Sequence, residues 1–277
     1  QVHRAVLRNG RKPLALKVQR PKIRSKIETD LDILAYAANL LHERKDSLRL
    51  YNFPGMVRSI RRTLQHELDF SREARHMKIA RNLMADLSGI QIPRVYPDLS
   101  STRLLVMDYM QGRKLKEADR HRLSNAEILA KNGMQAIVKQ ILEDGFFHAD
   151  PHPGNLLITG DETICLLDWG MVGRLIQQER HVLLNLILAI VEHDAQRLSD
   201  ALLVITAGSA DLDRQELERD LLNLMDYHIT GNLAELRLER FLMDVVDIVR
   251  KYRLRIPSNH FITLKALITA EGTARLL

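Results

Sequence analysis

Two short segments of this sequence carry residue types suited to phosphoryl transfer. Residues 148–155 read HADPHPGN, and Asp168 begins a D-W-G tripeptide thirteen residues further on. Phosphoryl transfer needs a carboxylate near the attacking oxygen and metal ions on the phosphates, with little covalent help from the protein. We therefore predict that Asp150 orients the nucleophile or accepts its proton. Asn155 and Asp168 would hold Mg²⁺, which prefers hard oxygen ligands.

The loop around Asp150 has the composition of a preorganised site. Pro151 and Pro153 have fixed φ angles, and we expect Gly170 to adopt an unusual backbone angle after Asp168. The alternative interpretation is a polar turn between a helix and a strand. A short strand pair between the two segments, together with a D-W-G at this distance, favours the phosphotransfer site.

A nucleotide site also needs a cation for the phosphates. Lys17, in the segment LALKV, lies on a predicted strand where a kinase-type lysine belongs. Without the downstream loop we would interpret it as an exposed strand lysine. A helical carboxylate should position this lysine, and the candidates are Glu67, Asp69 and Glu73.

A nucleotide base would lie against a hinge that follows a later strand. We predict that Met107, Asp108, Tyr109 and Met110 line the adenine there, mainly through backbone contacts. No Gly-rich phosphate loop precedes Lys17, so that loop either lies outside this chain or is replaced by another arrangement.

The histidines and the cysteine near the loop have simpler interpretations. No Cys or His partners follow His148 and His152 at metal-ligand spacing. We therefore predict that His148 is a structural residue of the loop and that His152 is a loop residue near the site. Cys165 is the only cysteine, which excludes an intrachain disulfide. It lies in an apolar strand, where a thiol is usually inert.

The predicted elements alternate between strands and helices in the first half of the chain. Residues 2–20 read as a hairpin around Asn9-Gly10, helical patterns cover 22–50 and 56–87, and strand-like segments cover 91–96 and 103–110. This order indicates a two-lobed α+β protein.

The second half is predicted to be mainly helical. Ser124 and Glu127 form a capping-box pattern before a helix. A tight hairpin around Gly160-Asp161 joins two short strands, and the last hundred residues are helices. The apolar stripe over residues 238–252 has helical spacing and is expected to be core.

Composition excludes a disordered tail, a collagen-like fibre, a disulfide scaffold and a transmembrane helix. Apolar residues make up 45% and charged residues 27%, as in ordinary globular domains, and the longest apolar stretch is half of a bilayer span. Net charge is +6, with +10 in residues 1–63. On charge alone this basic quarter is best interpreted as a solvated basic face; with the catalytic loop, it suits a phosphate ligand or an anionic membrane surface. Nucleic acid is disfavoured because no aromatic residues are interleaved with the basic ones.

Several segments together resemble one family, the UbiB/ADCK atypical kinase-like proteins. The similar segments are QVHRA at 1–5, KVQRP at 17–21, ELDF with EA at 67–74, HADPHPGN at 148–155 and TAEG at 269–272. The resemblance covers nearly the whole chain. It implies a bilobal protein-kinase-like fold, with a small mixed N-lobe over 1–112 and a mostly helical C-lobe over 113–277.

The resemblance also implies a function. Such a protein would bind ATP and Mg²⁺ and support isoprenoid quinone (ubiquinone) biosynthesis. It would be peripheral, at the cytoplasmic face of a membrane, with a lipid or quinone precursor and quinone-biosynthesis proteins as partners. By this resemblance, Lys17 would contact the phosphates and Asp150 would be the catalytic-loop acid. Glu73 would be the carboxylate partner of Lys17, with Glu67 as the second choice.

The chain departs from the family pattern in three ways. The K-x-G-Q helix and most of the alanine-rich loop would precede Gln1, so we expect a domain whose front is missing. The C-terminal membrane helices of some relatives are absent, and Trp169 replaces the usual Phe of D-F-G. No A-P-E motif follows Gly170, which argues against ordinary protein-substrate docking.

Two alternatives remain open from the sequence. A small-molecule kinase of the aminoglycoside or choline type shares the H-x-D-x-x-x-x-N loop, although residues 17–21 and 67–73 favour the first interpretation. A nucleotide-sensing scaffold without catalysis is the other. The intact Asp150, Asn155 and Asp168 disfavour an inactive site but do not distinguish slow hydrolysis from switching.

Overall fold

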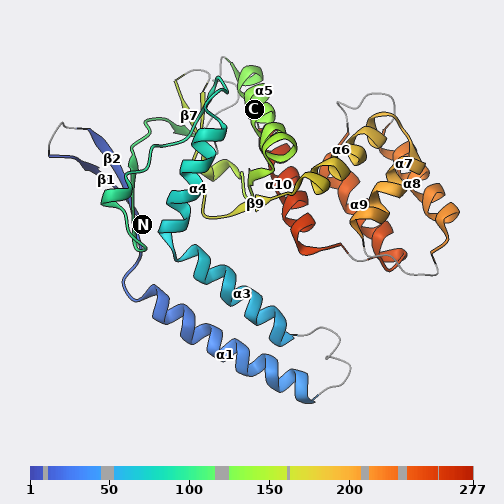
Figure 1. Cartoon of the computed structure of the whole chain (residues 1–277), viewed down its shortest axis with the longest axis horizontal. Helices are drawn as coiled ribbons and strands as arrows, with labels where there is room; N and C mark the ends of the chain where they lie inside the picture. The colour runs from blue at the N-terminus through green and yellow to red at the C-terminus, as the bar shows by residue number, and fades with distance from the viewer. Residues whose placement is uncertain are drawn as a thin grey trace. The chain divides into compact units, whose positions relative to one another are not determined.

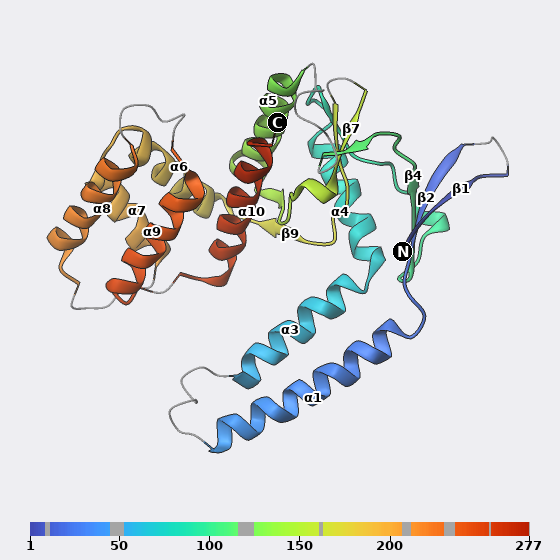
Figure 2. The ribbon, with the colours of Figure 1, turned by 180° about the vertical axis from the view of Figure 1, so that it is seen from behind.

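The computed structural model describes eight stretches of the chain (Figures 1 and 2), which are 1–8, 12–44, 53–115, 125–160, 163–206, 212–229, 236–254 and 256–276. These residues form two compact units. The first unit contains residues 1–82, 92–111 and 168–171, and the second contains 83–91, 112–167 and 172–277.

An antiparallel three-stranded sheet organises the first unit. Its strands are β1 (Val2–Val6), β2 (Pro13–Val18) and β4 (Leu104–Asp108), in the order β1-β2-β4. The predicted hairpin at the start of the chain is confirmed, since Val2 pairs with Lys17 across β1 and β2. Its Asn9-Gly10 turn lies outside the described residues.

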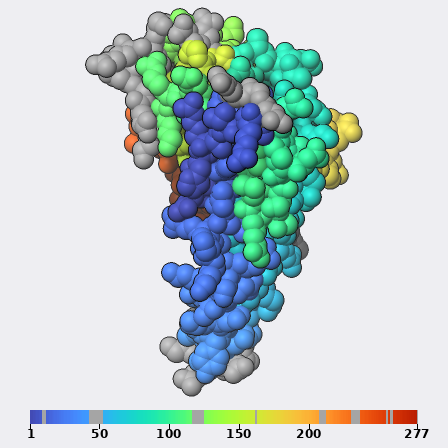
Figure 3. Space-filling model, turned by 90° about the vertical axis from the view of Figure 1, so that its left-hand side faces the viewer, coloured from blue at the N-terminus to red at the C-terminus, as the bar shows by residue number. Residues whose placement is uncertain are grey.

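Three helices complete the described part of the first unit. Helices α1 (Ile23–Arg44) and α3 (Phe53–Glu67) pack against each other as a pair, and α4 (Phe70–Leu83) follows. In the space-filling view, side chains of β1 and α1 lie on the face shown (Figure 3). Within the described residues, the first predicted helix is confirmed from Ile23 to Arg44.

The second predicted helix is wrong as a single element. It is interrupted at Leu68 and Asp69 and ends at Leu83. The Asp69 carboxylate accepts a hydrogen bond from the Ser71 backbone N–H at 3.0 Å, and the Phe70 N–H donates to the Thr102 carbonyl. Aspartate often starts a helix in this way, and apolar periodicity alone does not detect such a break.

The strand predicted over residues 91–96 is also wrong in its extent. Only β3 (Ile90–Gln91) is a strand, and it runs parallel to β8 in the second unit. Further along, Val95 forms an isolated bridge with Met107. Pro93 lies between these two pairings and has no N–H to donate, so it does not support a continuous ladder.

The second unit contains two small sheets. The larger one has the order β3-β8-β7-β5, with β5 (Arg113–Lys114), β7 (Leu156–Thr159) and β8 (Thr163–Leu166), and β6 (Phe146–His148) pairs with β9 (Val172–Arg174). The predicted β7–β8 hairpin is confirmed by the pairing of Leu156 with Leu166. Gly160 has φ +64° in its turn, and Asp161 lies outside the described residues.

The helix before β6 starts differently from the prediction. Helix α5 (Ala126–Val138) has Asn125 as its N-cap, without a side-chain capping bond, and Ser124 of the predicted capping box lies outside the described residues. The helix continues as a π-helical segment (Lys139–Asp144), which ends at Gly145 in the left-handed region.

The remaining helices confirm the predicted helical C-terminal region. They are α6 (Gln177–Val191), α7 (Ala195–Ile205), α8 (Arg214–His228), α9 (Leu238–Lys251) and α10 (Ser258–Ala274). The stripe on α9 is core as predicted, because Phe241, Val245 and Val249 are buried among leucines of α7 and α8. Among the described helices, none is both long and apolar enough to span a bilayer.

Candidate active site

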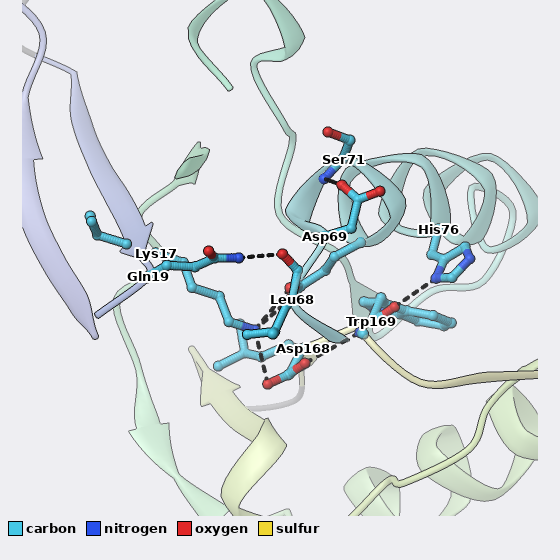
Figure 4. Close-up of polar contacts among 12 residues, drawn as sticks. Lys17, Gln19, Leu68, Asp69, Ser71, His76, Asp168 and Trp169 are labelled. Carbon is cyan, nitrogen blue, oxygen red and sulfur yellow. Dashed lines mark hydrogen bonds and ion pairs between the residues drawn. The ribbon is translucent and has the colours of Figure 1, made fainter. Parts of the chain in front are cut away.

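Lys17 lies at the centre of a carboxylate cluster in the first unit (Figure 4). Its Nζ donates to both carboxylate oxygens of Glu73 at 2.9 Å and to Asp168 Oδ2 at 3.1 Å. Of the three candidate acids, the structure brings Glu73 to the lysine. Glu67 ends α3, and Asp69 caps α4.

The Lys17–Glu73 pair is largely removed from solvent. Glu73 is 3% exposed in the first turn of α4. Burial raises the pKa of the Glu73 carboxyl to about 7; Lys17 opposes this shift, and the neighbouring Asp168 carboxylate adds to it. Burial acts to lower the pKa of Lys17, but the two carboxylates outweigh it and the pKa is raised. The lysine is therefore held charged at one fixed position.

Asp168 adopts the unusual backbone angle that the sequence predicts for Gly170. Its φ is +47°, whereas Gly170 is not among the described residues with positive φ. The expectation for Gly170 was wrong because aspartate tolerates the left-handed region when its short carboxylate bonds the local backbone. Here Asp168 Oδ1 accepts from the Gly170 N–H at 3.3 Å.

Helix α4 contacts two consecutive residues of the D-W-G segment. Glu73 and Asp168 share the Lys17 ammonium, and one helical turn further His76 Nδ1 lies 2.9 Å from the Trp169 carbonyl oxygen (Figure 4). Residues three apart lie on the same helix face, so α4 positions both groups from one side. No local sequence pattern predicts the contact of His76 with Trp169.

His148 supports the loop that carries Asp150, as predicted for a structural residue. It is 1% exposed, its Nδ1 accepts from the Asp150 N–H at 3.0 Å, and its Nε2 lies 3.0 Å from the Leu167 carbonyl oxygen. An accepting Nδ1 requires that Nε2 carry the proton and donate to the carbonyl. The ring is therefore neutral. It links the loop that carries Asp150, before the β7–β8 hairpin, to Leu167, which follows the hairpin and precedes Asp168.

The rest of the loop is held by short-range hydrogen bonds. His152 Nδ1 accepts from the Gly154 N–H at 3.0 Å, which confirms a local role for this histidine. The Asn155 Nδ2 donates to the Asp150 carbonyl at 3.2 Å. The amide nitrogen is used for this bond, and the amide oxygen is thus the atom suited to a metal ion.

Helix α10 adds two contacts to the same loop. The Thr273 hydroxyl, in a side chain that is 6% exposed, is shared between the Pro151 carbonyl at 3.0 Å and the Thr269 carbonyl at 2.7 Å. Lys265 Nζ lies 3.4 Å from Asp150 Oδ1. Lys265 and Thr273 are eight residues apart, so they lie on one face of the helix. Lys265 was not predicted as a site residue, because a single lysine on a C-terminal helix carries no local signal of its partner.

The predicted hinge residues form the end of β4 and the segment after it. Met107 is buried in the sheet, while the Asp108 carboxylate binds Lys12 Nζ at 2.8 Å and the Tyr96 hydroxyl at 2.7 Å. Tyr109 is exposed, and its N–H donates to the Pro13 carbonyl. The Asp108 side chain is thus occupied, which leaves backbone groups for any contact with a base.

The donor chemistry of these residues fits Mg²⁺ rather than zinc. Asp168 and Asn155 offer a carboxylate and an amide oxygen, which Mg²⁺ combines with substrate phosphates. No group of three or more His, Cys, Asp or Glu residues in the described part of the chain is placed to hold a metal ion. Cys165 is fully buried, and burial raises the pKa of its thiol to about 12, in agreement with the predicted inert core role.

Comparison with protein families decides the assignment. The ABC1 atypical kinase-like domain matches residues 1–202, and the UbiB helical domain matches residues 221–277. The chain belongs to the ABC1 atypical kinase-like domain family. The resemblance inferred from the motifs is thereby confirmed.

Known relatives cover the full chain. It is 31% identical over 280 residues to "Protein ACTIVITY OF BC1 COMPLEX KINASE 7, chloroplastic" of Arabidopsis thaliana, covering 100% of this chain and 40% of that protein. It is 29% identical to "Probable protein kinase UbiB" of Shewanella piezotolerans, covering 100% of this chain and 52% of the relative. The chain thus spans about half or less of the length of these two relatives.

A solved structure supports the fold. The complex of Rv3197 with erythromycin from Mycobacterium tuberculosis aligns with a TM-score of 0.74 at 17% identity, covering 100% of this chain and 70% of that one. With the family match, this confirms the predicted α+β, protein-kinase-like fold.

Proposed function

We propose that this protein binds Mg-ATP and acts as an atypical kinase or ATPase, with an N-lobe over residues 1–112 and a C-lobe over 113–277. The observation that carries the proposal is the Lys17 ammonium, held by Glu73 and Asp168 at 2.9 and 3.1 Å. A strand lysine paired with a helical carboxylate and with the aspartate of a D-W-G segment is the arrangement that kinase-type phosphate binding requires. Membership of the ABC1 atypical kinase-like family supports it.

Each residue has a distinct part in this proposal. Lys17 neutralises phosphate oxygens of the nucleotide, and Glu73 keeps its ammonium in position. Asn155 and Asp168 hold the metal ion, which supplies positive charge to the phosphates when bound. Asp150 orients the acceptor or water and takes its proton.

Two further groups complete the proposed site. The hinge at Met107, Asp108, Tyr109 and Met110 contacts the adenine through its backbone. Lys265 Nζ lies 3.4 Å from Asp150 Oδ1, so the lysine would help to position that carboxylate before an acceptor binds.

We further propose that the protein works in isoprenoid quinone (ubiquinone) biosynthesis at the cytoplasmic face of a membrane. The relative named UbiB supports the quinone context. A lipid or quinone precursor would be the small-molecule partner, and other quinone-biosynthesis proteins would be macromolecular partners.

The α1–α3 pair is the proposed membrane-contacting element. Helix α3 has no buried residue, and large apolar side chains on both helices are 45–68% exposed, namely Ile33, Leu34, Tyr36, Leu41, Met56 and Ile60. Basic residues are mixed among them, such as Arg24, Lys26 and Arg58. Exposed apolar residues next to basic ones suit an anionic membrane surface.

The experiment that tests the enzymatic proposal measures ATP hydrolysis by the full-length protein. It is run with and without anionic liposomes and a quinone-precursor analogue, and we expect Mg²⁺-dependent turnover that both additions increase. Robust phosphorylation of an aminoglycoside or choline would instead support the small-molecule kinase. Full rescue of quinone synthesis by Asp150→Asn would support the non-catalytic scaffold.

The membrane element is tested by liposome sedimentation. Replacing Ile33, Leu34 and Tyr36 with serine should reduce binding to anionic vesicles. The matched control replaces three exposed apolar residues on other helices, Val191, Val204 and Tyr227. Equal binding of both variants and the original protein would contradict the assignment of this surface.

A further inference from the structure

A second charged pocket lies in the first unit, apart from the Lys17 cluster. It has a volume of about 520 Å³, within the range of small-molecule sites. Helix α4 forms one wall, and the segment 93–101 forms the other. The Lys17 cluster shares none of the residues that line it.

The lining of this pocket is basic and contains no carboxylate. Four cationic side chains, Arg75, Lys78, Arg81 and Arg94, are all exposed to solvent at its edge. Three of them, Arg75, Lys78 and Arg81, recur along α4 at a spacing of three residues. None of the thirteen described lining residues is acidic.

None of these four cations forms an ion pair within the described structure, although Arg94 lies over the Tyr96 ring, 5.6 Å from its centroid, and its charge helps to lower the pKa of Asp108. The salt bridges found among the described residues do not include Arg75, Lys78, Arg81 or Arg94. Elsewhere in the first unit, by contrast, Lys12, Lys17 and Arg61 each have a carboxylate partner. Concentrated positive charge in a concave surface attracts anions.

The polar groups of the pocket suit a phosphate. Arginine donates from a planar fork that matches two phosphate oxygens at once. Hydroxyls of Ser71, Ser100 and Ser101 and the amide of Asn82 also line the pocket. Ala74, Met77, Pro93 and Val95 add apolar lining that is suited to the carbon part of a ligand.

We propose that this pocket binds a phosphate-bearing ligand, at a site separate from the proposed nucleotide site. The phosphate belongs either to a soluble organic phosphate or to the headgroup of an anionic lipid. The proposal does not depend on ATP turnover, because it concerns only anion binding by α4 and the segment 93–101.

The test measures binding of two probes by the full-length protein without divalent cations. One probe is inorganic pyrophosphate, followed by calorimetry. The other is a vesicle of phosphatidylcholine and phosphatidic acid in equal amounts, compared with pure phosphatidylcholine. The pocket variant carries Arg75→Gln, Lys78→Gln and Arg81→Gln, and the matched control replaces three exposed cations of the second unit, Lys131, Arg219 and Arg240, with glutamine.

We expect the pocket variant to bind one or both probes roughly tenfold more weakly or worse, since charge-assisted hydrogen bonds are lost, while the control binds normally. Loss with pyrophosphate identifies a soluble phosphate, and loss only with vesicles identifies a lipid headgroup. A variant that keeps a positive charge at two of these positions, Arg75→Lys with Arg81→Lys, should retain most of the binding, which would assign the loss in the pocket variant to the removed charge.

The Lys17→Ala variant distinguishes binding at the proposed nucleotide site from binding at this pocket. Pyrophosphate binding that disappears in Lys17→Ala and persists in the pocket variant would overturn the proposal. Equal binding of both probes by the pocket variant, the control and the original protein would overturn it as well.

Discussion

The Lys17 ammonium lies 2.9 Å from both carboxylate oxygens of Glu73. This contact joins strand β2 to helix α4, and the contact of Lys17 with Asp168 adds the D-W-G segment. Three segments far apart in the chain thus meet at one cation. The arrangement predicts how the protein responds when either partner is changed.

Removing the lysine should affect the buried acid more than the rest of the fold. In Lys17→Met, Glu73 loses the group that lowers the pKa of its carboxyl, so this pKa should rise above about 7. The variant should lose ATP binding and become less stable by about 1–3 kcal/mol, because a buried polar group loses its partner. Thermal unfolding and nucleotide titration measure the two effects. In Lys17→Met with Glu73→Gln, part of the stability should return; additive losses would contradict a direct pair.

The pKa of Glu73 also predicts how stability depends on pH. A carboxyl whose pKa is raised from 4.5 to about 7 on folding binds its proton more tightly in the folded state. Its contribution to stability is therefore complete below about pH 4.5 and is lost as pH rises through about 7. Urea unfolding of the ligand-free protein at several pH values should show this decline. Glu73→Gln should flatten the curve in that range, and an unchanged slope would contradict the assigned shift.

The α10 helix should stabilise the loop that carries Asp150. Thr273→Val removes the hydroxyl that donates to the Pro151 carbonyl and should destabilise the protein by about 1–3 kcal/mol, because a buried acceptor loses its donor. The matched control is Thr63→Val in α3, where an exposed threonine bonds a carbonyl four residues earlier. We expect turnover to fall in Thr273→Val and not in the control. Equal effects in both would show that α10 does not position the loop.

Two glycines offer a paired test of loop geometry. A Cβ on Gly154 would lie 2.7 Å from His152 Cε1, so Gly154→Ala should displace the ring that caps the loop and lower activity. A Cβ on Gly272 would have no atom within 4 Å, so Gly272→Ala in helix α10 should stabilise the protein by about 0.5–1 kcal/mol. Assays of turnover and melting temperature compare the two. Normal activity of Gly154→Ala would contradict a fixed loop.

Much of the fold could be predicted from the sequence where local patterns decide the structure. The hairpins at β1–β2 and β7–β8 and the apolar stripe on α9 follow from periodicity and turn residues. The helix break at Leu68 and Asp69 could not be predicted from apolar periodicity. It involves a hydrogen bond from the Phe70 N–H to the carbonyl of Thr102, which is far away in the sequence.

The candidate site could likewise be predicted only in part from the sequence. Motif spacing identified Lys17, Asp150 and Asp168, and it left three acids as partners for the lysine. The choice among them depends on the start and direction of α4, which the periodic pattern did not resolve. Lys265 could not be found, since its contact with Asp150 depends on how α10 packs against the loop.

Turnover by Asp168→Asn tests the central claim most directly. The matched control is Asp98→Asn, which changes an exposed aspartate in the 3₁₀ turn Pro97–Leu99 of the same unit. With the full-length protein and Mg-ATP, we predict that hydrolysis falls by roughly a hundredfold or more in Asp168→Asn and stays normal in Asp98→Asn. Hydrolysis by Asp168→Asn equal to that of the original protein would contradict the proposed metal site and the account built on it.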